Sequence, residues 1–205
     1  MAINQVITID ENDTQYTDMI KEVKEGMNKD NLVIIARSEK NRKADDVRPL
    51  SIKKGIYFYV AYSLQDKLAF PCKYDPEDIE IAKRNTINKA RIGNMFEVLL
   101  GGGKKLSNWT PSGETMNVTT LYGNANGAGL LLCEDFWKAI HEKFKGDFYI
   151  LPSSIRELIL VSKSSGKDKA DLDAMVRDIN MNLVNDDEFL ADQVFEARDW
   201  MVDNR

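Results

Sequence analysis

The segment from Asp147 to Val161, which reads DFYILPSSIRELILV, constrains the fold more than any other part of the sequence. It contains two short apolar runs, residues 148–151 and residues 155–161, with a Pro-Ser-Ser break between them. Apolar runs of this length that are bounded by turn residues are typical of β-strands, and proline is disfavoured inside a sheet. The segment therefore predicts two strands joined by a turn.

Two further strand pairs are predicted upstream. Residues 56–62, IYFYVAY, are aromatic and β-branched, and residues 68–72 follow after a short polar stretch. Residues 117–122 and 127–132 surround the sequence Asn-Ala-Asn-Gly, and its Asn-Gly step suits a turn that needs positive φ. The other strand-like segments are residues 5–10 and residues 32–36, the second of which also fits a helical turn.

The clearest helix start is at Asp75 and Pro76. Aspartate is a favoured N-cap, proline is favoured in the first turn, and Glu77 and Asp78 complement the positive end of the helix dipole. This helix is predicted to continue to about residue 91. Apolar residues recur at helical spacing in four other segments, which are residues 16–27, 134–145, 169–183 and 186–202.

Antiparallel hairpins with helices between and after them indicate an α+β fold rather than a doubly wound α/β fold. The expected architecture is an antiparallel sheet built from hairpins, with helices packed against it and two helices at the C-terminal end. A chain of 205 residues can form one such domain, residues 1–205. A subdivision into residues 1–100 and residues 114–205 is the alternative.

The composition predicts a soluble, cytoplasmic protein. No apolar run reaches the ~18–20 residues that span a bilayer, and the N-terminal sequence lacks the basic and apolar regions of a signal peptide. Cys72 and Cys133 are the only cysteines, too few for a disulfide framework. We therefore expect reduced thiols and no membrane partner.

The net charge of −5 is distributed unevenly. Residues 168–205 contain eleven acidic and four basic residues, a local net charge of −7. Basic residues gather instead between residues 37 and 54. A surface divided in this way can dock a charged partner or pair with itself, and the alternative is a set of solvated helix faces and loops.

The sequence lacks the patterns of several catalytic chemistries. His141 is the only histidine, and it follows Cys133 by eight residues. That spacing is about 12 Å along a helix axis, too far for a Cys–His pair within one helix. The same residues lack zinc-ligand spacing, and residues 101–105 lack the first glycine and the hydroxyl residue of a phosphate-binding loop. No catalytic residue, metal ligand or cofactor is therefore predicted, with a carboxylate cluster from distant residues as the alternative.

Several strings in the second half of the chain are specific enough to suggest a family. They are Met116-Asn117-Val118, the run GAGLLL at residues 127–132, and above all YILPSSIRELILV at residues 149–161. These strings resemble a domain-of-unknown-function family that is common in Gram-positive gut anaerobes and their mobile elements. The resemblance runs from residue 117 to residue 192 and continues more weakly back to residue 56. The sequence departs from the family in having Arg156 in place of the usual histidine, and in a short N-terminal region.

These observations favour a non-enzymatic intracellular protein that binds another protein. The resemblance implies an accessory protein of a mobile element or phage that modulates a host macromolecule, such as a defence component. Trp109 is interpreted as an exposed contact in the polar loop at residues 101–113. The predicted contact residues come from this loop and from the basic segment, and they are Trp109, Lys104, Lys105, Arg37, Arg42, Lys43, Arg48 and Lys54.

Two other functions stay open. A nucleic-acid-binding protein could use the basic segment, with Tyr57 and Tyr59 stacking on bases if they are exposed, although a pI of about 5.1 argues against it. A carboxylate- or metal-dependent hydrolase or nuclease would need at least three carboxylates gathered in one cleft.

Overall fold

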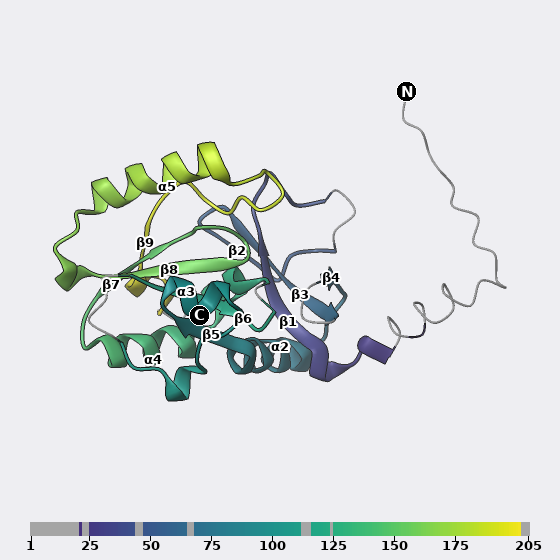
Figure 1. Cartoon of the computed structure of the whole chain (residues 1–205). Helices are drawn as coiled ribbons and strands as arrows, with labels where there is room; N and C mark the ends of the chain where they lie inside the picture. Colours follow the sequence, from purple (N-terminus) through teal and green to yellow (C-terminus); the bar gives the residue numbers. More distant parts are fainter. Residues whose placement is uncertain are drawn as a thin grey trace, which may run out of the picture.

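The computed structural model describes residue 21 and residues 25–43, 47–64, 68–111, 116–123 and 125–201 (Figure 1). The predicted strand at residues 5–10 lies outside these residues, as does most of the predicted helix at residues 16–27. The described chain forms two antiparallel sheets with helices packed against them, which confirms the predicted α+β class. None of the described helices is long and apolar enough to cross a membrane.

The first sheet contains β1 (Leu32–Arg37), β2 (Ser51–Lys53), β3 (Ile56–Leu64) and β4 (Leu68–Pro71). The long strand β3 lies in the middle, with β1 along one side and with β2 and β4 one after the other along the opposite side. The pairing of β3 with β4 confirms the predicted hairpin. Strand β1 is the apolar run that periodicity alone left undecided between strand and helix.

The second sheet has the strand order β5-β6-β8-β7-β9. Its strands are β5 (Ala90–Gly93), β6 (Met116–Leu121), β7 (Phe148–Leu151), β8 (Glu157–Ser162) and β9 (Phe195–Glu196). Strands β7 and β8 pair antiparallel across the Pro-Ser-Ser turn, as their sequence predicts. This hairpin supplies two of the three central strands of the sheet.

Four α-helices are described, namely α2 (Pro76–Lys89), α3 (Met95–Leu99), α4 (Glu134–Phe144) and α5 (Lys169–Leu183). Helix α2 begins at the predicted residue, where the backbone N–H of Asp75 donates to the Asp78 carboxylate at 3.0 Å. Short 3₁₀-helices are η1 (Lys29–Asn31), η2 (Leu106–Asn108), η3 (Gly127–Leu132), η4 (Lys163–Ser165) and η5 (Ala197–Trp200).

The prediction of a strand at residues 127–132 is wrong, because this segment forms η3. Asn126 adopts the expected left-handed conformation, with φ of 56°, but the chain then crosses β1 instead of returning along β6. Gly129 packs directly on the backbone of Ile34, and Gly127 on that of Arg156. An apolar run has no periodicity that separates a strand from a buried helical segment, and here close backbone contacts decide.

The prediction of a second C-terminal helix at residues 186–202 is also wrong. Only η5 is helical in the described part of this segment, and Phe195–Glu196 forms β9 at the edge of the second sheet. There Phe195 pairs with Ile150 and Glu196 with Tyr149. Pairing with an open strand edge therefore overrides the helical spacing of the apolar residues.

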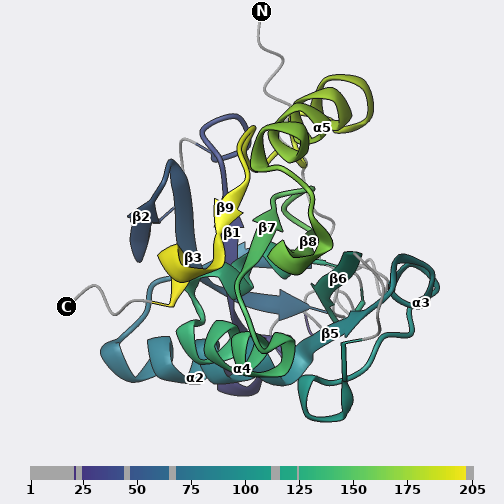
Figure 2. The same cartoon turned by 90° about the vertical axis from the view of Figure 1, so that its left-hand side faces the viewer.

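Helices cover both faces of the second sheet. Leu172 and Val176 of α5 pack in a small apolar cluster on one face. Phe136, Trp137 and Ile140 of α4 belong to the main cluster on the other face, which also includes residues of β1 and β3. Figure 1 and Figure 2 accordingly show α5 on the opposite side of the molecule from α2 and α4. That residues 1–205 form one domain, rather than two, stays a prediction.

Candidate functional site

Helix α3 and the glycine-rich turn after it lie at the right-hand edge of the molecule in Figure 2. Asn94 and Glu97 form a capping box, in which each side chain accepts a hydrogen bond from the other residue's backbone N–H, at 2.9 and 3.2 Å. Gly101, with φ of 75°, ends the helix and donates its N–H to the Val98 carbonyl at 3.0 Å. Lys104 then exchanges two backbone hydrogen bonds with Ile92 of β5, at 2.8 and 2.9 Å. Both ends of the segment are therefore fixed.

Three apolar side chains of this segment face solvent. The exposed fraction is 79% for Phe96, 86% for Leu100 and 47% for Met95, whereas Val98 is 1% exposed and anchors the helix in the core. Successive helical residues are about 100° apart, so the three exposed side chains lie on one side of the helix. We call Met95, Phe96 and Leu100 the α3 surface. The sequence showed an apolar run here but not which residues would be exposed.

The predicted contact loop lies directly after the α3 surface, and only part of it is exposed. Lys104 and Lys105 are exposed, as predicted contacts should be. Trp109 is 3% exposed, so its interpretation as an exposed contact is wrong. Its ring packs edge-on against Phe144 of α4, with centroids 5.6 Å apart, and its carbonyl accepts a hydrogen bond from Lys143 at 2.7 Å. The polar neighbours of Trp109 suggested exposure, but α4 covers it from a distant part of the chain.

The predicted contact residues of the basic segment do not all have the same neighbours. The Arg42 guanidinium lies 4.7 Å from the centre of the Tyr57 ring and pairs with Glu39 at 3.2 Å. Lys54 pairs with Asp199 at 2.9 Å, on another part of the surface. Arg48 is exposed in the segment that leads to β2. The Arg37 guanidinium lies 6.0 Å from the centre of the Tyr59 ring, so Arg37 and Arg42 cover the same cluster, whereas Lys54 pairs elsewhere.

Neither of the tyrosines proposed for base stacking has a fully exposed ring. Tyr59 is 1% exposed and belongs to a small apolar cluster on the first sheet. Tyr57 is half-buried beneath Arg42, and its hydrogen bond to Glu39 raises the pKa of its hydroxyl. The condition for stacking, an exposed ring, is therefore not met by Tyr59 and only partly by Tyr57.

Arg37 and Lys43 face two open hollows on the first sheet. One hollow, of about 350 Å³, lies beside β4. The other, of about 450 Å³, lies between this basic end and the acidic residues Asp186 and Asp187. The walls of the second hollow are tied together, since Asn41 and Ser38 both donate side-chain hydrogen bonds to the Phe189 carbonyl, at 2.6 and 3.0 Å.

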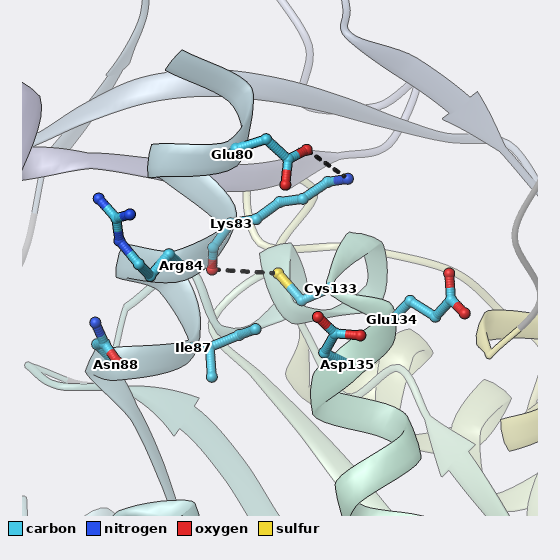
Figure 3. A pocket seen from close by; sticks show the side chains of 8 residues that line it. All are labelled: Glu80, Lys83, Arg84, Ile87, Asn88, Cys133, Glu134 and Asp135. Carbon is cyan, nitrogen blue, oxygen red and sulfur yellow. Dashed lines mark hydrogen bonds and ion pairs between the residues drawn. The ribbon is translucent and has the colours of Figure 1, made fainter. Parts of the chain in front are cut away.

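A further pocket, of about 420 Å³, lies between α2 and the start of α4 (Figure 3). Its only thiol, Cys133, is 1% exposed, and the sulfur lies 3.9 Å from the Lys83 carbonyl and 3.8 Å from the Gly129 carbonyl. Burial raises the pKa of the Cys133 thiol to about 12. A thiol that stays protonated at neutral pH is a poor nucleophile, so this pocket does not offer cysteine chemistry.

The histidine and the buried cysteine of the described chain have separate partners. His141 pairs with Asp147 at 3.4 Å, at the end of α4, rather than with Cys133. Among the described residues, no three or more histidine, cysteine, aspartate or glutamate side chains are arranged to hold a metal ion.

The fold and these surfaces define an α+β protein of two antiparallel sheets, with exposed apolar side chains on a short, rigidly held helix. Residues 73–196, more than half of the chain, match the family of unknown function DUF5688, and the chain belongs to this family. The match includes α2 but not β3, to which the weaker resemblance was expected to extend. No curated protein and no solved structure matches the chain.

Proposed function

We propose that this protein binds another protein through the α3 surface and catalyses no reaction itself. The observation that carries the proposal is the exposure of Phe96 and Leu100 on a helix whose two ends are fixed by hydrogen bonds. Clusters of large, solvent-exposed apolar side chains are typical of interaction sites. Burying each one in a partner would contribute about 1.5–3 kcal/mol.

The rigidity of the segment supports binding rather than incidental exposure. Ordering a loop upon binding costs conformational entropy, and a preformed helix avoids most of that cost. Lys104 and Lys105 follow the apolar residues and are exposed, so a partner with an apolar pocket and an acidic rim fits best. Aromatic residues in such a position often account for most of the binding energy.

The biological setting is proposed from the resemblance of the sequence to proteins of Gram-positive gut anaerobes and their mobile elements. In that setting the partner would be a host protein inside the cell, such as a component of a defence system. This part of the proposal depends on analogy, because family membership alone does not define a function.

The test is affinity capture of the tagged, full-length chain from host lysate, with and without nuclease, followed by mass spectrometry. We expect one stoichiometric protein partner that survives nuclease treatment. Phe96→Ser and Leu100→Ser should each reduce its recovery at least ten-fold. Leu183→Ser is the matched control, because Leu183 is 79% exposed on α5, and it should capture the partner normally.

Other outcomes would point to the alternative functions. Capture that disappears with nuclease would favour nucleic-acid binding, whose affinity should then fall steeply with salt. Equal capture by wild type, Phe96→Ser and Leu100→Ser would show that the α3 surface is not the binding site.

A further inference from the structure

We propose that the free edge of β4 binds an extended peptide of a partner protein, one in which apolar and acidic side chains alternate. This site lies on the first sheet, and it does not depend on the α3 surface or on the function proposed for it. Two features of β4 and one of its surroundings support the inference. Strand β4 has outward backbone groups and two exposed apolar side chains, and Arg37 and Lys43 line the hollow beside it.

The backbone of β4 has hydrogen-bonding groups that point away from the sheet. The N–H of Cys72 donates to the Val60 carbonyl at 3.0 Å, so Cys72 and Val60 occupy a hydrogen-bonded position between β3 and the end of β4. Such pairs alternate along antiparallel strands. Phe70 and Leu68 therefore bond to β3, whereas Ala69 and Pro71 occupy the outward positions. The outward groups are the N–H and carbonyl of Ala69 and the carbonyl of Pro71, because proline has no N–H.

No strand of the described chain pairs with this edge. Unpaired groups on an edge strand are a template for another strand, and many peptide-binding domains use them in this way. Ala69 is half-buried and its neighbours Leu68 and Phe70 are exposed, so the edge is accessible. A strand of four residues spans about 13 Å, enough for four or five residues of a bound peptide.

The two faces of the edge differ in chemistry. Leu68 and Phe70, which are 60% and 45% exposed, share one face. Ala69 is on the other face, where it packs against the apolar cluster that contains Tyr59. Arg37 and Lys43 line the hollow of about 350 Å³ beside β4, which all four residues of β4 also line. The strand register places Arg37 on the same face as Ala69. Arg37 pairs with Tyr57 and Ala69 pairs with Ser63, and Tyr57 and Ser63 are an even number of residues apart on β3, so their side chains share a face.

These two faces define the occupant. Side chains of an added strand alternate between the faces, so every second residue would contact Leu68 and Phe70, and the residues between would lie near Arg37 and Lys43. Apolar residues suit the first environment and glutamate or aspartate the second. Pairing with a second copy is less favourable, because it would bring two Arg37–Lys43 pairs together on the same face.

The test uses two fluorescein-labelled peptides, Val-Glu-Val-Glu-Val-Glu-Val and its counterpart with lysine in place of glutamate. Fluorescence anisotropy would measure their binding to the full-length chain. We expect the glutamate peptide to bind at least ten-fold more tightly. Ala69→Pro should weaken its binding at least ten-fold, because the proline ring replaces the outward N–H and blocks the edge. Ala69→Ser keeps that N–H and should bind as the wild type does.

A charge reversal tests the second feature and covers the case in which Ala69→Pro disturbs the fold. Lys43→Glu should reduce the preference for the glutamate peptide at least ten-fold, and Phe96→Ser should leave it unchanged. Equal binding of the two peptides, or a Lys43→Glu variant with the wild-type preference, would overturn the proposal. Sedimentation velocity of the chain without peptide gives a further test. The proposal would be overturned if the chain forms a dimer that Ala69→Pro, but not Ala69→Ser, converts to monomer.

Discussion

Substituting Gly129 by alanine tests whether η3 has to pack directly on β1. A Cβ at this position would overlap the carbonyl oxygen of Ile34, and it would lie 2.7 Å from the carbonyl carbon and 3.3 Å from the Cα of Ile35. All three atoms belong to the backbone of a strand whose side chains are almost fully buried, so neither element can move aside easily.

The expected cost can be bounded from these contacts. Inserting a single methyl group into a well-packed interior costs about 1–3 kcal/mol, and the upper part of that range applies when backbone must shift. We therefore expect Gly129→Ala to lower the free energy of unfolding by about 3 kcal/mol, out of the ~5–15 kcal/mol typical of a domain.

Gly146 provides the matched control for this substitution. A Cβ at Gly146 would meet no atom within 4 Å. Alanine there should be neutral or should stabilise the fold by up to about 1 kcal/mol, because it lowers the conformational entropy of the unfolded chain. Urea denaturation followed by circular dichroism would compare the two variants with the wild type. If Gly129→Ala and Gly146→Ala unfold at the same urea concentration, the close packing of η3 on β1 is incorrect.

Three further predictions concern individual side chains. Trp109→Ala should lower the free energy of unfolding by about 3–5 kcal/mol, because a large buried ring is removed, while Phe96→Ala should change it by less than about 0.5 kcal/mol; urea denaturation measures both. Cys133, whose thiol has a pKa of about 12, should react with iodoacetamide at pH 8 only after denaturation, as read by peptide mass spectrometry. The Asp75 backbone N–H and Lys29 lower the pKa of Asp78 in the folded chain, so the stability that Asp78 contributes is present above its unfolded pKa and is lost as pH falls through the folded value. Asp78→Asn should therefore reduce the loss of stability between pH 5 and pH 2, which urea midpoints over that range would show.

The parts of the fold that could be predicted from the sequence are those determined by nearby residues. Asp75 and Pro76 define the start of α2 through capping, which involves residues within one turn. The β7–β8 hairpin follows from two apolar runs around a Pro-Ser-Ser turn. In both cases the residues that determine the structure are adjacent in the sequence, so no knowledge of tertiary contacts is needed.

The errors occur where distant residues decide. Residues 127–132 form η3 because Gly129 can approach Ile34, which is almost a hundred positions earlier in the chain. Phe195–Glu196 is a strand because the edge of β7 is open to it. Trp109 is buried because Phe144 of α4 lies over it. None of these contacts leaves a periodic pattern in the local sequence.

The candidate binding surfaces could be predicted only in part from the sequence, for the same reason. Residues 95–100 are apolar except for Glu97, which in sequence terms suggests burial, yet Val98 is buried while Met95, Phe96 and Leu100 are exposed. The helix is only five residues long, and Val98 anchors it while Met95 and Phe96 face solvent. The edge of β4 is similar, because Leu68 and Phe70 lie beyond the area that the core covers. Exposed lysines follow the α3 surface in the sequence, and Arg37 and Lys43 line the hollow beside β4, although the whole chain carries a net charge of −5. This local arrangement, rather than the overall charge, is what would favour partners that present apolar and acidic groups together.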